Sequence, residues 1–285
     1  MQWFTPQHQD NLRSDGYAVF RGVIPRGLAG RAAREIASFV GADTDDPSTW
    51  YSDHLINRGV IPVHHAQILW DIRQHPNIYR VFAEIHGTHK LLVDINRCCF
   101  HPPRHPDWPG AGSGEIHWDI DPRAPTIGWL QGVVLLSDVE ENGGGFQCVP
   151  HIYQRLDDWL DDNALGDDFD FFNPGISFDE AIHIEGSASA LIVWRTLLPH
   201  RPAPNLSHRP RIAQFVSMGR ISANAALMRH VANWCIDKRS AEIWRGWPYQ
   251  QDPEPGRPVQ LTSLGRRLVG IDPWPDEPEA ATARG

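Results

Sequence analysis

The sequence predicts a mainly β fold, a sandwich or barrel, flanked by helices. Short segments rich in strand-forming residues follow one another from Lys90 to Ser222, and turns separate them. They do not alternate with long helical segments, as the strands of a parallel βαβ sheet would. Helical periodicity marks the regions on either side. No repeat or linker divides the chain, so we expect a single domain, residues 1–285, with a barrel core of about 90–222 and helical flanks over 1–89 and 223–275.

The N-terminal flank combines helical patterns with one strand. Proline near its start and glycine at its end mark the longest helix, and a second proline divides the last helical stretch, since proline breaks the helical hydrogen bonding. An Asp-Gly turn signal precedes the strand. The helices are expected over residues 6–13, 25–41 and, as two pieces that meet near His75-Pro76, 66–87; the strand is expected over Tyr17–Ile24, and the acidic stretch 42–54 is expected to be a loop.

The central region predicts short strands, one irregular loop and one acidic insertion. The insertion carries a helical pattern over residues 153–163 within the stretch 154–172, and the C-terminal flank is helical again beyond Ser222. The strands are expected over residues 90–100, 115–122, 129–139, 144–150, 181–186, 190–196 and 211–219, the loop over 101–114, and the C-terminal helical segments over 240–247 and 261–274, on either side of a Pro-rich stretch.

Composition excludes several classes of protein. Hydrophobic residues make up 41% of the chain and charged residues 21%, which is enough to bury a core. The formal net charge is −9 and no basic block is present, so we expect no nucleic-acid partner. The sequence has neither an apolar run of membrane-spanning length nor a signal-peptide pattern, and its four cysteines form no disulfide framework. We therefore expect a cytoplasmic protein, a monomer or homodimer that does not bind membranes.

The stretch GEIHWDID, Gly114 to Asp121, contains a histidine and a carboxylate two residues apart. Residues i and i+2 of a strand face the same way, so His117 and Asp119 would project together while Trp118 points to the opposite face. Such a pair supplies two of the three ligands of a facial Fe(II) site. The pair alone is weak evidence, because a His–Asp hydrogen bond at a strand edge gives the same pattern.

A second histidine and an arginine follow at the far end of the β region. His200 comes after an apolar strand and a short turn, where it could supply a third ligand. Arg211 begins the next strand pattern, and its guanidinium could hold a carboxylate through two parallel hydrogen bonds. Arg209 is the weaker candidate, since Pro210 removes an amide that a central strand needs. Together these residues predict a metal site with a clamp for an organic diacid.

With these motifs the chain resembles the phytanoyl-CoA hydroxylase-like family of Fe(II)/2-oxoglutarate-dependent dioxygenases. The resemblance runs from about Gly16 to Trp274 and includes DGYAVFRGVI, HWDID, LQGVVLLSDVEENGGGFQCVP and LLPHRPAPNLSHRPRIAQFVSM. It implies a double-stranded β-helix, a jelly-roll (cupin-like) barrel. It also implies Fe(II) ligation by His117, Asp119 and His200, with O2 as the second substrate and Arg211 as the clamp for the distal carboxylate of 2-oxoglutarate.

The sequence also departs from the family. Cys99 stands where many relatives have an asparagine that contacts the co-substrate, and His151-Ile152-Tyr153 replaces Gly-Ser-His. Gln131 could supply a hydrogen bond to 2-oxoglutarate in compensation. The loops 42–54 and 101–114 and the segment 154–180 are expected to shape substrate choice. The candidate substrate-binding residues are Arg104, Trp118 and Trp194.

The expected activity is hydroxylation of an unactivated C–H bond of a small molecule, with release of succinate and CO2. A CoA thioester would need several basic contacts for its phosphates, which the sequence does not indicate. Desaturation, epimerisation and cyclisation use the same ligand set and stay open. From other classes, a non-catalytic or vestigial jelly-roll that binds a small molecule and a zinc-dependent hydrolase also stay open, although a hydrolase gives no reason for Arg211.

Overall fold

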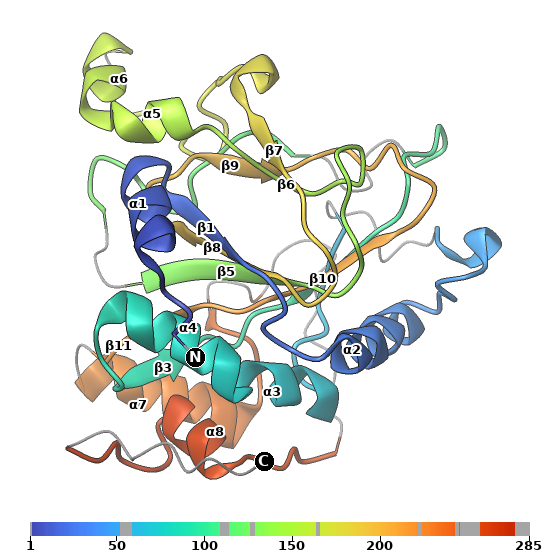
Figure 1. The fold of residues 1–285 in the computed structure, drawn as a ribbon, viewed down its shortest axis with the longest axis vertical. Helices are drawn as coiled ribbons and strands as arrows, with labels where there is room; N and C mark the ends of the chain where they lie inside the picture. Colours follow the sequence, from blue (N-terminus) through green and yellow to red (C-terminus); the bar gives the residue numbers. More distant parts are fainter. Residues whose placement is uncertain are drawn as a thin grey trace.

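Two antiparallel sheets form the centre of the computed structural model (Figure 1). The structure describes residues 2–51, 59–108, 114–125, 129–163, 166–221, 224–242, 245 and 257–276. Apolar side chains of both sheets meet in one buried cluster, among them Val133 and Ile192 of the larger sheet and Phe146 and Ile184 of the smaller. In the described part of the chain, no helix is long and apolar enough to cross a membrane.

The larger sheet contains eight strands and the smaller sheet three. In the larger sheet the order is β1-β8-β5-β10-β4-β2, and β11 pairs with both β3 and β5. In the smaller sheet the order is β7-β6-β9. The larger sheet comprises β1 (Tyr17–Phe20), β2 (Val60–Ile61), β3 (Leu91–Val93), β4 (Cys98–His101), β5 (Trp129–Leu135), β8 (Leu191–Arg195), β10 (Arg211–Phe215) and β11 (Met218–Arg220); the smaller comprises β6 (Phe146–Cys148), β7 (Ile182–Ile184) and β9 (His200–Pro202).

Helices cover the larger sheet on the side away from the smaller one (Figure 1). The first helix, α1, instead lies beside β1, and two short helices of the acidic insertion lie near the smaller sheet. The helices are α1 (Pro6–Ser14), α2 (Arg26–Phe39), α3 (Gln67–Arg73), α4 (Pro76–His86), α5 (Pro150–Gln154), α6 (Leu156–Asp162), α7 (Asn224–Ala232), which continues as a π-helix (Asn233–Asp237), and α8 (Ser263–Leu268); two 3-10 turns span Pro47–Thr49 and Phe178–Glu180.

Helix α4 shows how the sequence defines these elements. The His75 side chain accepts a hydrogen bond from the Asn77 amide at its start, and Gly87 ends it at φ +62°, a conformation that favours glycine. Its buried face includes Phe82, which packs close to Gly132 of β5. A Cβ at Gly132 would lie 2.6 Å from the Val216 carbonyl oxygen and 3.1 Å from the Phe82 ring, so glycine is required where helix and sheet meet.

Three expectations for the β region need correction. The predicted strand 90–100 is two strands, because the Asp94 amide donates to the Ser217 carbonyl and the chain changes partner there. The predicted strand 211–219 is likewise divided into β10 and β11. Residues 115–122 form no strand; their one β contact is an isolated bridge between His117 and His200.

The C-terminal flank is helical beyond Ser222, as expected. Its first helix, α7 with the π-helix, spans 224–237, ahead of the two segments for which helical bounds were expected. Of the predicted helical segment 240–247, residues 243–244 and 246–247 lie outside the described residues. In the described part of 261–274, α8 is found as expected, with the Thr262 side chain accepting a hydrogen bond from the Gly265 amide at its start.

Candidate metal centre

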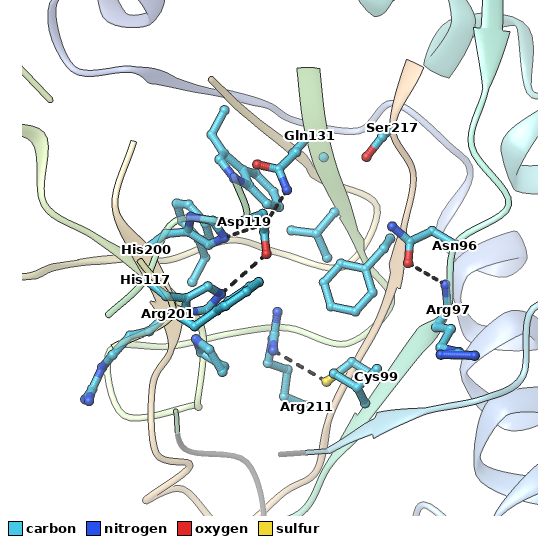
Figure 2. Close-up of a pocket in the computed structure, with 18 residues that line it drawn as sticks. Asn96, Arg97, Cys99, His117, Asp119, Gln131, His200, Arg201, Arg211 and Ser217 are labelled. Atoms are coloured by element: carbon cyan, nitrogen blue, oxygen red, sulfur yellow. Dashed lines mark hydrogen bonds and ion pairs between the residues drawn. The ribbon is translucent and has the colours of Figure 1, made fainter. Parts of the chain in front are cut away.

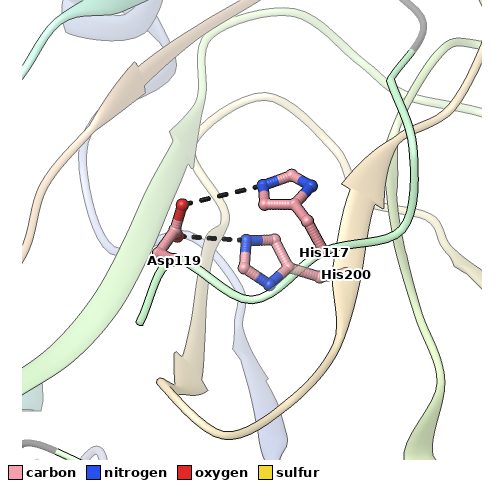
Figure 3. Close-up of side chains that lie close together, drawn as sticks. All are labelled: His117, Asp119 and His200. Carbon is pink, nitrogen blue, oxygen red and sulfur yellow. Dashed lines mark ion pairs between the residues drawn. The ribbon is translucent and has the colours of Figure 1, made fainter. Parts of the chain in front are cut away.

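Three predicted ligands meet at one point between the two sheets (Figure 3). Two backbone hydrogen bonds, of 2.9 and 3.0 Å, join His117 to His200 at the start of β9. This bridge brings the distant histidine beside the segment that carries the other two ligands. The Asp119 carboxylate oxygens lie 3.6 Å from His117 Nε2 and 3.3 Å from His200 Nε2, and all three ligand atoms lie within 4.8 Å of one another.

Both imidazole rings are oriented by backbone carbonyls. Nδ1 of His117 lies 2.8 Å from the Glu115 carbonyl oxygen, and Nδ1 of His200 lies 2.9 Å from that of Leu198. A carbonyl oxygen only accepts, so each Nδ1 carries a proton, and each Nε2, on the side of Asp119, is the nitrogen left either to donate to Asp119 or, without its proton, to bind a metal. Two imidazole lone pairs and one carboxylate are a donor set that fits a divalent metal such as Fe(II).

The Asp119 carboxylate is ionised and held in place from a second side. Burial by itself raises its pKa, but hydrogen bonds and charge interactions with His117 and His200 outweigh burial and hold that pKa well below the usual range. The Gln131 amide, on β5, donates a hydrogen bond to Oδ2 of the same carboxylate. Gln131 therefore restricts rotation of Asp119, so that the carboxylate keeps its position between the two histidines.

The three ligands line a cavity of about 340 Å³ (Figure 2). Most of the wall is apolar, as is typical of cavities that bind organic ligands. Residues of both sheets and of the insertion form the apolar wall, which includes Val60, Val133, Phe146, Phe172, Trp194 and Phe215.

Arg211 extends into the same cavity from the start of β10 (Figure 2). Its side chain is 4% exposed, and Nη1 lies 3.5 Å from the Cys99 sulfur, a weak acceptor. Its Nε has no hydrogen-bond partner, and no ion pair joins its guanidinium to a carboxylate among the described residues. A buried guanidinium without an anion is unfavourable, so this geometry fits a carboxylate ligand.

The chain is similar to known proteins in sequence and in fold. No protein-family model matches the chain. A curated protein of Dictyostelium discoideum named "Putative phytanoyl-CoA dioxygenase" is 24% identical over 254 residues, covering 71% of this chain and 72% of the relative. The resemblance to phytanoyl-CoA dioxygenases is confirmed. It agrees with the dioxygenase motifs found in the sequence.

Solved structures share the fold at low identity. GIG2 from Candida albicans superposes with a TM-score of 0.67 at 13% identity, over 96% of this chain and 78% of its own. EvdO2 from Micromonospora carbonacea var. aurantiaca, complexed with 2-oxoglutarate, superposes with a TM-score of 0.53 at 16% identity, over 77% of this chain and 92% of its own. The epimerase SnoN, in complex with Fe3+, alpha ketoglutarate and nogalamycin RO, superposes with a TM-score of 0.52 at 14% identity, over 75% of this chain and 82% of its own. The mainly β fold predicted for this chain is the fold of these proteins.

The remaining predicted residues divide into two groups. Cys99, Gln131 and Trp194 line the cavity, and the Trp194 ring lies 5.2 Å from that of His200. Arg104 is exposed on the loop and does not line the cavity.

Trp118 does not line the cavity either. It is fully buried on the opposite side of its segment, and its Nε1 donates to the Leu197 carbonyl. Its ring packs against Trp159 and Phe169 of the insertion, at centroid distances of 5.3 and 6.3 Å. Its role is structural, because the side chain between two ligands points away from the metal face.

Several cavity residues were missed by the sequence analysis. Phe215 could have been predicted, because it lies four residues after Arg211 on the same strand and therefore faces the same side of the sheet. Asn96 and Ser217 lie at breaks between strands, and Phe172 lies in the insertion, where no periodic pattern indicates direction.

Proposed function

We propose that this protein is an Fe(II)- and 2-oxoglutarate-dependent oxygenase that hydroxylates an unactivated C–H bond of a small molecule. The observation that carries the proposal is the combination of His117, Asp119 and His200 with the buried, carboxylate-free guanidinium of Arg211 in one cavity. A histidine–carboxylate set alone would suit several metals and reactions. The additional cation supports a co-substrate with a carboxylate at its far end. Iron and 2-oxoglutarate are also present in the SnoN structure.

The residues of the chain divide the work of this reaction. Bound iron, with O2 and 2-oxoglutarate, supplies the oxidation of the C–H bond, and the co-substrate leaves as succinate and CO2. His117, Asp119 and His200 would hold the metal through two imidazole nitrogens and one carboxylate. Arg211 would bind the distal carboxylate of 2-oxoglutarate and so orient its other end toward the metal.

Other residues of the protein position a metal ligand and keep water away from the reacting groups. Gln131 keeps the Asp119 carboxylate in its ligating orientation, and the apolar wall excludes water from the reacting groups. We further propose that the two antiparallel sheets close as a double-stranded β-helix, and that residues 1–285 act as a single oxygenase domain. The ordered pairing within both sheets and their shared core support this reading.

The test is anaerobic addition of Fe(II) and then 2-oxoglutarate to the metal-free protein. We expect the weak visible absorption band of the iron chelate, its loss in His117→Ala, and weaker 2-oxoglutarate binding in Arg211→Ala. Arg209→Ala is the matched control, because Arg209 is exposed and does not line the cavity. Absence of both the band and 2-oxoglutarate binding in the wild-type protein would overturn the proposal. Product analysis then separates hydroxylation from desaturation, epimerisation and cyclisation.

A further inference from the structure

Phe172 lies at the mouth of the cavity. It lines the cavity and is also 44% exposed, whereas Val133, Trp194 and Phe215 in the same wall are largely buried. Its backbone is fixed in a turn: its amide donates to the Asp170 side chain at 2.9 Å. The Phe172 ring is therefore an ordered apolar surface that a molecule entering from solvent meets first.

The turn that carries Phe172 is joined to the metal-binding segment. The Trp118 amide, between His117 and Asp119, donates to the carbonyl oxygen of the neighbouring Phe171 at 2.9 Å. The aromatic cluster around Trp118 holds the same part of the insertion through Phe169. Because this hydrogen bond and the aromatic packing join the turn to the metal-binding segment, the fold sets the position of Phe172 relative to the metal ligands.

The positive charges of the cavity are already assigned. Arg211 serves the co-substrate in the proposed function. The Arg97 guanidinium donates to Ser240 Oγ at 3.2 Å and lies on the side of the cavity away from the metal ligands (Figure 2). The Arg201 guanidinium is engaged by three groups. Its Nε donates to Gln147 Oε1 at 2.8 Å and its Nη1 to the Gly114 carbonyl at 3.4 Å, and it lies 3.7 Å from the centroid of the Phe178 ring. This distribution does not favour a substrate with a carboxylate or phosphate.

A cationic substrate is disfavoured as well. Asp119 is the one acidic side chain among the described residues of the cavity wall, and it is a metal ligand. An ammonium group would enter an apolar cavity without a free carboxylate, at the full cost of its desolvation. The substrate that fits the wall is uncharged.

A polar end of the cavity lies opposite the metal ligands. Ser217 and Asn96 lie on the side away from His117 and His200 (Figure 2). Asn96 Oδ1 accepts from the Arg97 amide, and one N–H of its Nδ2 donates to the Asp94 carboxylate at 3.4 Å, which leaves the second N–H of Nδ2 to donate to a ligand. A hydroxyl and an amide N–H on one side of the cavity suit a hydroxyl or carbonyl oxygen of a ligand.

We propose that the substrate is an uncharged molecule with an apolar ring or chain that packs on Phe172, and with a hydroxyl or carbonyl oxygen that binds Ser217 and Asn96. Phe172 is then the residue that selects the apolar body. This inference rests on the proposed function, because it assigns to the substrate the part of the cavity that the bound metal and 2-oxoglutarate would not occupy.

Three probes that share one ring test the proposal: 2-(2-naphthyl)ethanol, 2-naphthylacetate and 2-(2-naphthyl)ethylamine. Their binding is measured by anaerobic equilibrium dialysis against protein loaded with Fe(II) and 2-oxoglutarate. We expect the alcohol to bind at least roughly tenfold more tightly than the acid or the amine, since a charged group would be desolvated without a partner. Phe172→Ala and Ser217→Ala should each weaken binding of the alcohol by roughly three- to tenfold.

The control variant is Leu206→Ala, which removes an exposed apolar side chain that does not line the cavity. It should bind the alcohol as the wild type does. Equal or tighter binding of the acid or amine, no binding of any probe, or an unchanged affinity in Phe172→Ala would overturn the inference. In these cases the visible band of the loaded protein is still present, whereas its absence would count against the proposed function and remove this inference with it.

Discussion

The Trp118 amide donates a hydrogen bond of 2.9 Å to the carbonyl oxygen of Phe171, and this bond ties the acidic insertion to the segment between two metal ligands. The Trp118 side chain strengthens the same connection, since it is fully buried against Trp159 and Phe169. The insertion therefore supports the segment that carries two of the metal ligands, and it also contributes Phe172 to the cavity mouth. A substitution that destabilises the insertion should therefore also disturb the geometry of the metal ligands.

Truncation of Trp118 tests this coupling. Trp118→Ala leaves a large cavity in the aromatic cluster and should lower the free energy of unfolding by roughly 3–5 kcal/mol. It should also weaken metal binding, because the hydrogen-bonded segment between His117 and Asp119 loses its anchor. Trp118→Phe keeps much of the packing and should bind the metal more tightly than the alanine variant. Urea unfolding and titration with Fe(II) measure the two effects; unchanged metal affinity in Trp118→Ala would contradict the coupling.

Removal of the Gln131 amide should affect the metal directly. Gln131→Ala deletes the donor to Asp119 Oδ2, and loss of a group that orients a metal ligand typically weakens metal binding by roughly 10- to 100-fold. Gln131→Glu should be worse still, because it places a second negative charge beside the Asp119 carboxylate. The measurement is a competition titration between the protein and a chelator.

Gln147→Ala is the control for this experiment. Gln147 accepts a hydrogen bond from Arg201 and does not line the cavity. Its truncation should leave the metal affinity unchanged. If Gln131→Ala and Gln147→Ala bind the metal equally well, Gln131 does not orient Asp119.

The sequence predicts the ligands better than the element that carries them. The spacing of His117 and Asp119 suggested a strand, but Asp121 accepts a hydrogen bond from the Arg123 amide and turns the chain, so pairing is limited to one bridge. The alternation still held over three residues, which is why Trp118 points away from the metal face. Its direction followed from the sequence, whereas the aromatic partners that bury it came from a distant insertion.

The mouth of the cavity could not be predicted in this way. Phe172 and Ser217 reach the cavity from a turn and from a break between two strands. Hydrophobic periodicity reports direction only inside regular elements, so it gives no direction for either residue. Their positions depend on tertiary contacts, such as the bond between Trp118 and Phe171, that no local pattern encodes.

The geometry of the Arg211 fork should matter in addition to its charge. Lysine at this position keeps the positive charge but cannot form two parallel hydrogen bonds to a carboxylate. We expect Arg211→Lys to raise the KM for 2-oxoglutarate by roughly tenfold or more while the metal affinity stays near that of the wild type. Succinate release at varied 2-oxoglutarate concentration measures the first quantity. An unchanged KM would show that Arg211 does not bind the co-substrate.

The C-terminal flank should make the protein sensitive to acid through His230. His230 lies on α7, close to the Leu268 backbone of α8. Burial lowers its pKa to about 4, against a hydrogen bond with the Leu268 backbone that raises it. Because the folded-state pKa lies below the unfolded value of about 6.5, the stabilisation is complete above pH 6.5 and is lost as the pH falls toward 4. The loss should reach roughly 2–3 kcal/mol at the low end of this window.

A variant that cannot titrate isolates this contribution. His230→Leu should unfold with a Tm that falls less between pH 6.5 and 4 than the Tm of the wild type, whatever its stability at neutral pH. The exposed His208 provides the comparison, since His208→Leu removes a histidine that is not buried and should keep the wild-type slope. Thermal unfolding at several pH values measures both. Equal slopes in the wild type and His230→Leu would mean that the acid sensitivity arises elsewhere, with half-buried His65, whose pKa burial also lowers to about 4, as the next residue to substitute.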